Sequence, residues 1–199
     1  LFPEGYRNDV QIVATVLSVE QDNAPEIAGM IGASCALSIS DIPFLGPIAG
    51  VRVGRIDGEF VINPTVEQRE KSDLNLTVAG SYDAVMMVEA GANELSEEVV
   101  LDAILFGHEE IKRLVKFQQE MMEKCGKEKH QPKLFTVPEE LVNAIHEYTY
   151  DKFDAAVRDA DKLRRDEHVA EVKAQAKEHF LELYPEMDME IDYVLYKTL

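Results

Sequence analysis

Hydrophobic and polar residues alternate along residues 73–80, where Leu74, Leu76 and Val78 are separated by the polar residues Asn75 and Thr77. A period of two predicts a β-strand with one buried face. A Gly-Ser turn follows, and the apolar residues after it predict a second strand over residues 84–89. Asn75 and Thr77 would then lie together on the other face of a sheet.

Residues 9–19 are rich in β-branched side chains and apolar at successive positions, which is typical of an interior strand. A helix is predicted to follow and to end near Ser40, with Asn23 as its N-cap, Pro25 in its first turn and Glu26 in the capping-box position. Its many alanines and glycines predict close approach to a neighbouring backbone, so we expect this helix to be buried on the sheet.

Two hairpins are predicted next. Residues 48–56 form a strand, Asp57-Gly58 matches a two-residue hairpin turn, and residues 59–63 return as the partner. Residues 65–72 form a charged connection to the strand at residues 73–80. The order of strand, helix and two hairpins predicts an α+β fold.

A long helix is predicted from Ser96, which caps it, to Cys125, with Gly126 as its stop signal. Its apolar residues recur at helical spacing, so one face should close the domain. Composition then changes to a Lys-rich stretch without apolar periodicity. The predicted organisation is a first domain over residues 1–126, a linker over residues 127–137 and a helical domain over residues 138–199.

The net charge of −18 over 199 residues argues against a nucleic-acid backbone being held by this chain alone, because phosphate binding needs clustered Lys and Arg. The longest run of small apolar residues is broken by glycines and serines, which argues against a membrane span. Cys35 and Cys125 are interpreted as two reduced thiols of a cytosolic protein. Because the chain begins with Leu1, we expect it to be a piece of a longer protein.

Common catalytic patterns are missing from the sequence. No His-Glu-x-x-His pair, Gly-rich phosphate loop or G-x-S-x-G elbow occurs, and Ser34 lies in the small-residue helix, where burial is the better interpretation. Glu67, Glu70 and Asp73 would allow a two-metal cluster, but a solvated connection explains them more simply.

Five stretches of sequence resemble the polynucleotide phosphorylase (polyribonucleotide nucleotidyltransferase) family of bacterial phosphate-dependent exoribonucleases. They are LFPEGY at residues 1–6, MIGAS at 30–34, IPFLGPI at 42–48, VAG at 78–80 and FGHE at 106–109. In that family two ribonuclease PH-like cores flank a helical domain. The resemblance implies a ribonuclease PH-like mixed sheet with packed helices, specifically the first core, followed by a small all-helical domain.

The resemblance also implies where an active site would lie. In the catalytic second core of the family, the equivalent strand carries an aspartate, a lysine two positions later and another aspartate six residues upstream. Aligned on residues 78–80, these roles fall on Asn75, Thr77 and Arg69. None keeps the chemistry that Mg²⁺ and a phosphate need, so Mg²⁺ is expected to serve the parent enzyme and not to be bound here.

The phosphate pocket of the catalytic core is a glycine and serines at the start of the helix that corresponds to residues 23–40. Here Pro25 removes an amide and Glu26 adds a carboxylate, so orthophosphate should not bind. The resemblance therefore implies a non-catalytic scaffold segment, inactive alone. It further implies a parent that is a cytoplasmic homotrimer and releases nucleoside diphosphates from RNA, with RNA and phosphate bound elsewhere and no membrane contact. The alternative is a free-standing protein-interaction module.

Overall fold

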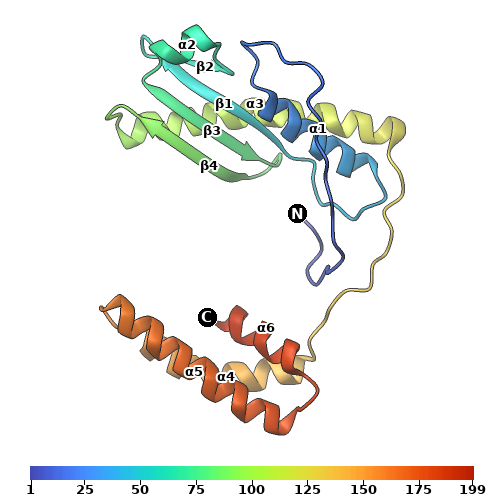
Figure 1. Ribbon diagram of the computed structural model, residues 1–199, viewed down its shortest axis with the longest axis vertical. Helices are drawn as coiled ribbons and strands as arrows, with labels where there is room; N and C mark the ends of the chain where they lie inside the picture. Colours follow the sequence, from blue (N-terminus) through green and yellow to red (C-terminus); the bar gives the residue numbers. More distant parts are fainter. The chain divides into compact units, whose positions relative to one another are not determined.

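The computed structural model describes residues 1–199 and divides into two compact units, Leu1–Leu134 and Phe135–Leu199. The first unit contains a sheet and its helices, and the second contains helices alone (Figure 1). The fold class is α+β, as predicted. None of the helices combines the length and the apolar character that crossing a membrane requires.

Four strands form the sheet of the first unit in the order β2-β1-β3-β4, and every neighbouring pair is antiparallel. They are β1 (Ala49–Ile56), β2 (Glu59–Ile62), β3 (Leu74–Gly80) and β4 (Val85–Ala92). The predicted Asp57-Gly58 turn joins β1 to β2, and both residues have a positive φ, 51° and 89°. These angles are those that a tight hairpin turn requires, so the hairpin prediction is confirmed.

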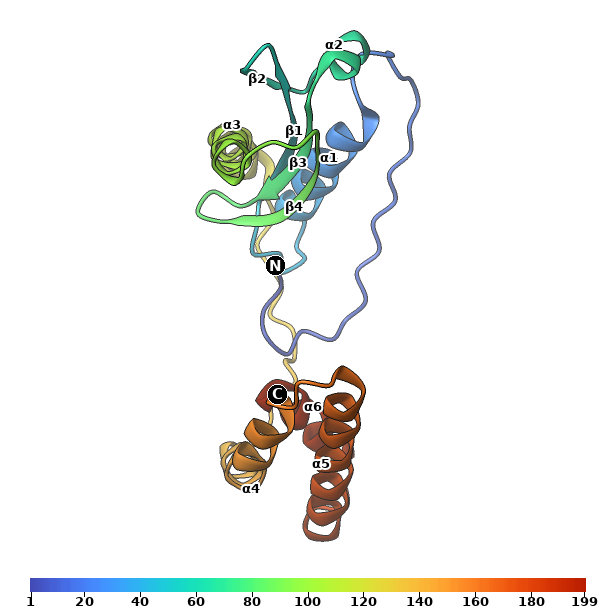
Figure 2. The same ribbon diagram turned by 90° about the vertical axis from the view of Figure 1, so that its left-hand side faces the viewer.

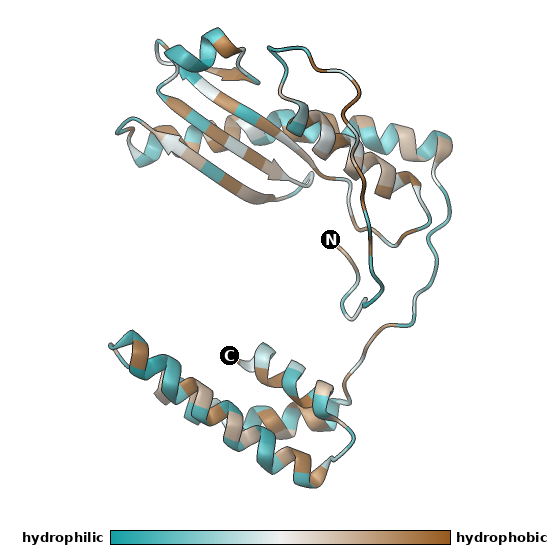
Figure 3. Cartoon of the chain, in the orientation of Figure 1, coloured by the Kyte–Doolittle hydropathy of each residue, from teal (hydrophilic) through white to brown (hydrophobic).

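The core of the first unit lies between the sheet and helix α3 (Glu97–Cys125). Figure 3 shows the apolar residues that line β1 and β3. The alternation predicted for β3 is confirmed, since Leu74, Leu76 and Val78 are all buried. Ser96 caps α3 by accepting a hydrogen bond from the backbone N–H of Val99. The helix ends where the sequence predicted.

Helix α1 (Pro25–Ile39) packs against the other side of β1 (Figure 2). Met30 lies so close to Gly50 that a Cβ added there would be 2.5 Å from the Met30 sulfur. The close approach predicted for the glycines of α1 is wrong at Gly29 and Gly32, whose Cβ positions face open space. The prediction that Asn23 caps the helix is also wrong, because the N-cap is Ala24 and the Asn23 amide bonds to the Glu20 carboxylate.

Residues 9–19 do not form the predicted interior strand. Val13 and Leu17 are 78% and 92% exposed. A strand is defined by hydrogen bonds to a neighbour, and none of the four strands pairs with this segment, so its β-branched residues have no ladder to join. The sheet is consequently antiparallel throughout rather than mixed.

The connection between β2 and β3 contains a short helix, α2 (Val66–Lys71), that the sequence analysis did not predict. Its N-cap is Thr65, whose hydroxyl accepts from the N–H of Gln68 while the Gln68 side chain accepts from the N–H of Thr65. This reciprocal capping box follows the T-x-x-Q pattern, so the signal was present in the sequence.

The second unit consists of three helices, α4 (Glu139–Val157), α5 (Lys162–Leu183) and α6 (Asp188–Thr198). The helical character predicted for residues 138–199 is confirmed. The shared core of the three helices includes Ile145, Phe180 and Ile191, and Lys177 of α5 bridges Asp188 and Asp192 of α6 at 3.0 and 2.7 Å. The assignment of residues 1–126, 127–137 and 138–199 to a core, a linker and a helical domain stays a prediction.

Candidate functional site

The polar residues of β3 lie on the sheet face that points away from α3. Asn75 is exposed and Thr77 is half-buried, whereas the alternating residues Leu74, Leu76 and Val78 are buried. Thr77 pairs with Arg52 of β1 on one side and with Glu89 of β4 on the other. This face therefore brings two of the predicted site residues together with an arginine and a carboxylate.

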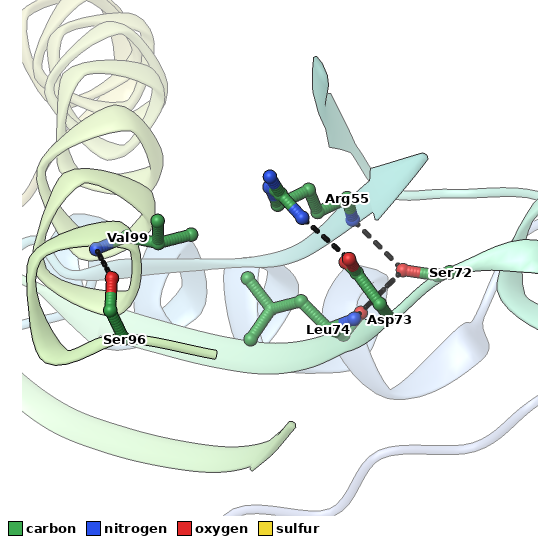
Figure 4. A network of polar contacts seen from close by, with 6 residues as sticks. All are labelled: Arg55, Ser72, Asp73, Leu74, Ser96 and Val99. Atoms are coloured by element: carbon green, nitrogen blue, oxygen red, sulfur yellow. Dashed lines mark hydrogen bonds and ion pairs between the residues drawn. The ribbon is translucent and has the colours of Figure 1, made fainter. Parts of the chain in front are cut away.

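A polar network holds the start of β3 (Figure 4). The Arg55 guanidinium forms an ion pair with Asp73, and the Arg55 backbone N–H donates to the Ser72 hydroxyl at 2.8 Å. The Ser72 hydroxyl in turn donates to the backbone oxygen of Leu74 at 2.6 Å. Asp73 is the carboxylate nearest to Asn75 in sequence, and it is engaged in holding β3 against β1.

The structure does not assemble the acidic cluster considered for residues 67–73. Glu67 pairs with Lys71 within α2 at 2.6 Å, and Asp73 is committed to Arg55. No group of three His, Cys, Asp or Glu side chains is placed to hold a metal ion. The remaining set of Arg69, Asn75 and Thr77 offers a cation, an amide and a hydroxyl, which does not fit a hard Mg²⁺ ion that prefers carboxylate oxygens.

The N-terminus of α1 carries the second predicted site. Pro25 stands in the first turn, where it supplies no N–H. The Glu26 carboxylate accepts a hydrogen bond from Arg52 Nη2 at 2.8 Å. The backbone N–H of Glu26 lowers the pKa of its carboxyl most, and Arg52 and then Arg69 lower it further against the opposing effect of burial. Glu26 thus occupies the anion-favouring helix end with a negative charge of its own.

Arg52 is the residue of this site that sequence reasoning missed. It stands between the buried residues Val51 and Val53 of β1, and an arginine in such a position is the signal that could have found it. Its side chain is 19% exposed, its backbone N–H donates to Asn63 Oδ1 at 2.9 Å, and its buried Nε has no partner. The guanidinium is therefore held by Glu26, while the backbone of Arg52 is held by Asn63.

A small pocket of about 180 Å³ opens beside Arg52, between α1 and the β1–β2 hairpin. Its polar lining comes from Asp22, Asn23, Arg52 and Asn63, and its apolar lining includes Ile27. The lining contains no Ser, Cys, His or Lys to serve as a nucleophile or as a base with a suitable pKa. None of Arg69, Asn75 and Thr77 lines it.

Replacing Arg52 by glutamine is expected to raise the pKa of Glu26 only part of the way to the ordinary glutamate range, because the backbone N–H of Glu26 remains. A carboxyl whose pKa is lowered by folding stabilises the protein at neutral pH, and this contribution is lost as pH falls through its folded-state pKa. Since Glu26 is 57% exposed, the pair contributes less than about 1 kcal/mol. NMR titration of the Glu26 carboxyl carbon in both proteins would measure the shift; equal pKa values would contradict the assigned role of Arg52.

Comparison with known proteins identifies the relatives of this chain. Residues 46–110 match the family "3' exoribonuclease family, domain 2". The chain is 56% identical over 195 residues to the polyribonucleotide nucleotidyltransferase of Heliobacterium modesticaldum, which covers 98% of this chain and 28% of that protein. It is 54% identical over 189 residues to the enzyme of the same name from Oceanobacillus iheyensis, covering 95% and 27%.

Among solved structures, rice Rrp46 superposes with a TM-score of 0.47 at 15% identity, over 53% of this chain and 51% of that one. The curated relatives are matched along nearly all of this chain, whereas the chain spans just over a quarter of their length. The resemblance read from the sequence is thereby confirmed. On identity of this level over nearly its full length, the chain belongs to the polyribonucleotide nucleotidyltransferase family.

Proposed function

We propose that this chain is a non-catalytic scaffold segment of a phosphate-dependent 3′-to-5′ exoribonuclease that releases nucleoside diphosphates. Its relatives are named polyribonucleotide nucleotidyltransferases, and the matched family is one of 3′ exoribonucleases. The catalytic centre, the RNA path and the Mg²⁺ site are assigned to other parts of the parent protein. The parent is proposed to be a cytoplasmic homotrimer.

The observation that carries this proposal is the ion pair between Glu26 and Arg52 at the start of α1. A helix N-terminus attracts phosphate through its free N–H groups and its positive end. Here Pro25 removes one N–H, and the Glu26 carboxylate would repel a phosphate while neutralising the nearest arginine. This arrangement supports the absence of orthophosphate binding in this segment.

The sheet face beside it supports the same conclusion for catalysis. Arg69 lies in α2 rather than on the sheet, and Asn75 and Thr77 offer no negative charge to a metal ion. An Mg²⁺ ion that bridges phosphate oxygens is usually held through one or two carboxylates. The only carboxylate at the start of β3, Asp73, is paired with Arg55.

The proposal is tested by replacing Arg69, Asn75 and Thr77 together by alanine in the full-length parent enzyme. Release of ADP from poly(A), with phosphate and Mg²⁺, is expected to stay within about twofold of the unsubstituted enzyme, because no transition-state contact is lost. A loss of about tenfold or more in kcat, with assembly and thermal stability unchanged, would assign chemistry to this segment. The matched control is the triple substitution of Glu67, Glu70 and Lys71 on α2 by alanine, because all three residues are exposed.

The chain of 199 residues alone is expected to release no ADP under the same conditions. Addition of the unsubstituted parent enzyme to the same reaction shows that substrate and phosphate are competent. Phosphorolysis by the purified chain, at a rate that scales with its concentration, would overturn the non-catalytic assignment.

A further inference from the structure

Sulfur atoms mark the place where α1 and the last turns of α3 meet. The Cys35 thiol of α1 lies 3.6 Å from the thioether sulfur of Met121 in α3. Cys125 stands one helical turn after Met121, and its thiol donates to the backbone oxygen of Met121 at 3.2 Å. Residues four apart on a helix share a face, so Cys125 lies on the side of α3 that contacts α1 through Met121.

A second contact joins the same two helix ends. The backbone N–H of Lys127, two residues after Cys125, donates to the backbone oxygen of Ile39 at 2.9 Å. Ile39 stands one helical turn after Cys35. The contact between Cys35 and Met121 and the hydrogen bond between Lys127 and Ile39 therefore hold the ends of α1 and α3 together near both cysteines.

The two thiols differ in their access to solvent. Cys125 is exposed and Cys35 is half-buried, and both are free thiols. Burial raises the pKa of the Cys35 thiol, and Cys125 raises it further. An exposed thiol and a shielded one that share the neighbour Met121 would let an oxidant react with the first and the second resolve it.

We propose that Cys125 and Cys35 are a peroxide-sensitive thiol pair that closes into an intramolecular disulfide between α3 and α1. The Cys125 sulfur attacks one oxygen of hydrogen peroxide, the O–O bond breaks, and a sulfenic acid and water form. The Cys35 sulfur then attacks the Cys125 sulfur, the S–O bond breaks, and the hydroxyl leaves as a second water with the Cys35 proton. Two thiols are oxidised to one disulfide while one peroxide is reduced to two waters.

Closure needs a local rearrangement at the end of α3. The Cys125 side chain must rotate away from the Met121 oxygen, a bond that a sulfur donor makes weakly. The Cα atoms must also come within about 4.4–6.8 Å of each other. Cys125 is the last residue of α3, where helix ends fray, so its backbone adjusts more readily than a mid-helix position would.

The disulfide would connect α1 to the segment that leads out of the first unit. It would close a loop over residues 35–125, and a loop of that length restricts the unfolded chain strongly. The thermal midpoint of the oxidised protein is therefore expected to rise by about 5 °C or more over that of the reduced protein.

The test is peroxide treatment of the full-length protein, followed by alkylation of the remaining thiols and digestion without reductant. Mass spectrometry is expected to find a peptide pair that links Cys35 to Cys125, lighter by two hydrogens, and dithiothreitol should remove it. In C125S, Cys35 should stay alkylatable after the same treatment. In C35A, the Cys125 sulfenic acid should persist and react with dimedone.

Three results would overturn the proposal. One is a Cys35 thiol that remains fully alkylatable while Cys125 proceeds to sulfinic or sulfonic acid. A second is a dimer linked through Cys125, and a third is oxidation confined to Met121. Because the mapped bond is the readout, the result does not depend on the activity of the parent enzyme or on its proposed function.

Discussion

Replacing Gly107 by valine is expected to destabilise the first unit by about 3 kcal/mol. A Cβ at Gly107 would lie 3.0 Å from Val53 Cγ2, 3.4 Å from Val51 Cγ2 and 3.5 Å from Val78 Cγ2. Valine adds two methyl groups beyond this Cβ, so α3 would have to lift from the sheet and open the core. Urea denaturation monitored by circular dichroism would measure the loss.

Two variants separate overpacking from helix propensity. Gln119→Val places the same side chain at an exposed position of α3 and should cost about 0.5 kcal/mol, which is the propensity difference alone. Gly107→Ala gains up to about 1 kcal/mol in propensity against a single tight contact, so it should cost much less than valine. Equal free energies of unfolding for Gly107→Val and Gln119→Val would contradict the explanation that close packing of α3 on the sheet requires glycine at position 107.

The elements that the sequence predicts well are those with local signals. The alternation of Leu74, Leu76 and Val78 states which face of β3 is buried, and Asp57-Gly58 supplies the positive φ angles of the hairpin. The limits of α3 follow from a serine cap and a glycine stop. In each case the information lies within a few residues, so no tertiary partner is needed to read it.

Residues 9–19 show the opposite case. Their composition indicates burial on both faces, but composition does not supply the neighbouring strands that would provide it. The structure leaves Val13 and Leu17 exposed because no strand pairs with them. An apolar run therefore indicates that burial of the segment would be favourable. Whether the segment is buried depends on partner strands elsewhere in the chain.

In the candidate site, too, local patterns place some residues correctly but do not predict the contacts between distant segments. Period two correctly places Asn75 and Thr77 on one face of the sheet. The ion pair between Glu26 and Arg52 joins a helix to a strand, and no local pattern encodes such a contact. The resemblance identified Pro25 and Glu26 as unsuited to phosphate, and the structure adds the arginine that holds Glu26 in place.

The predicted linker over residues 127–137 also makes tertiary contacts that its composition does not predict. The backbone N–H groups of Lys127 and His130 donate to the oxygens of Ile39 and Asp41. A Lys-rich stretch without apolar periodicity predicts a solvated connection. Here its first residues instead run beside the end of α1 and satisfy carbonyl groups that the helix leaves without partners.

Lys129 is the main residue of this contact. Its ammonium donates to three backbone oxygens at the end of α1, those of Leu37, Ser38 and Ser40, at 2.9, 2.8 and 2.7 Å. Burial lowers the pKa of Lys129, opposed by the nearby Asp41. A cation at a helix C-terminus is favoured by the dipole, and hydrogen bonds from a charged donor are stronger than neutral ones.

Lys129→Met is therefore expected to lower the free energy of unfolding of the first unit by about 2–3 kcal/mol, because it keeps the apolar stem and removes three charge-assisted hydrogen bonds. Hydrogen exchange should quicken most at the amides of Lys127 and His130, which this contact holds in place. Chemical denaturation and exchange mass spectrometry would measure the two effects.

Lys127→Met is the matched control. Its side chain is exposed and its contribution to α1 comes from the backbone N–H, which methionine retains, so its effect should stay within about 0.5 kcal/mol. Equal stability of the two variants would show that the hydrogen bonds from the Lys129 ammonium to the protein contribute no more free energy than the bonds to water that they replace. A selective loss at Lys129 would instead show that one lysine of an apparent linker fixes the end of α1, and with it the position of Cys35 beside α3.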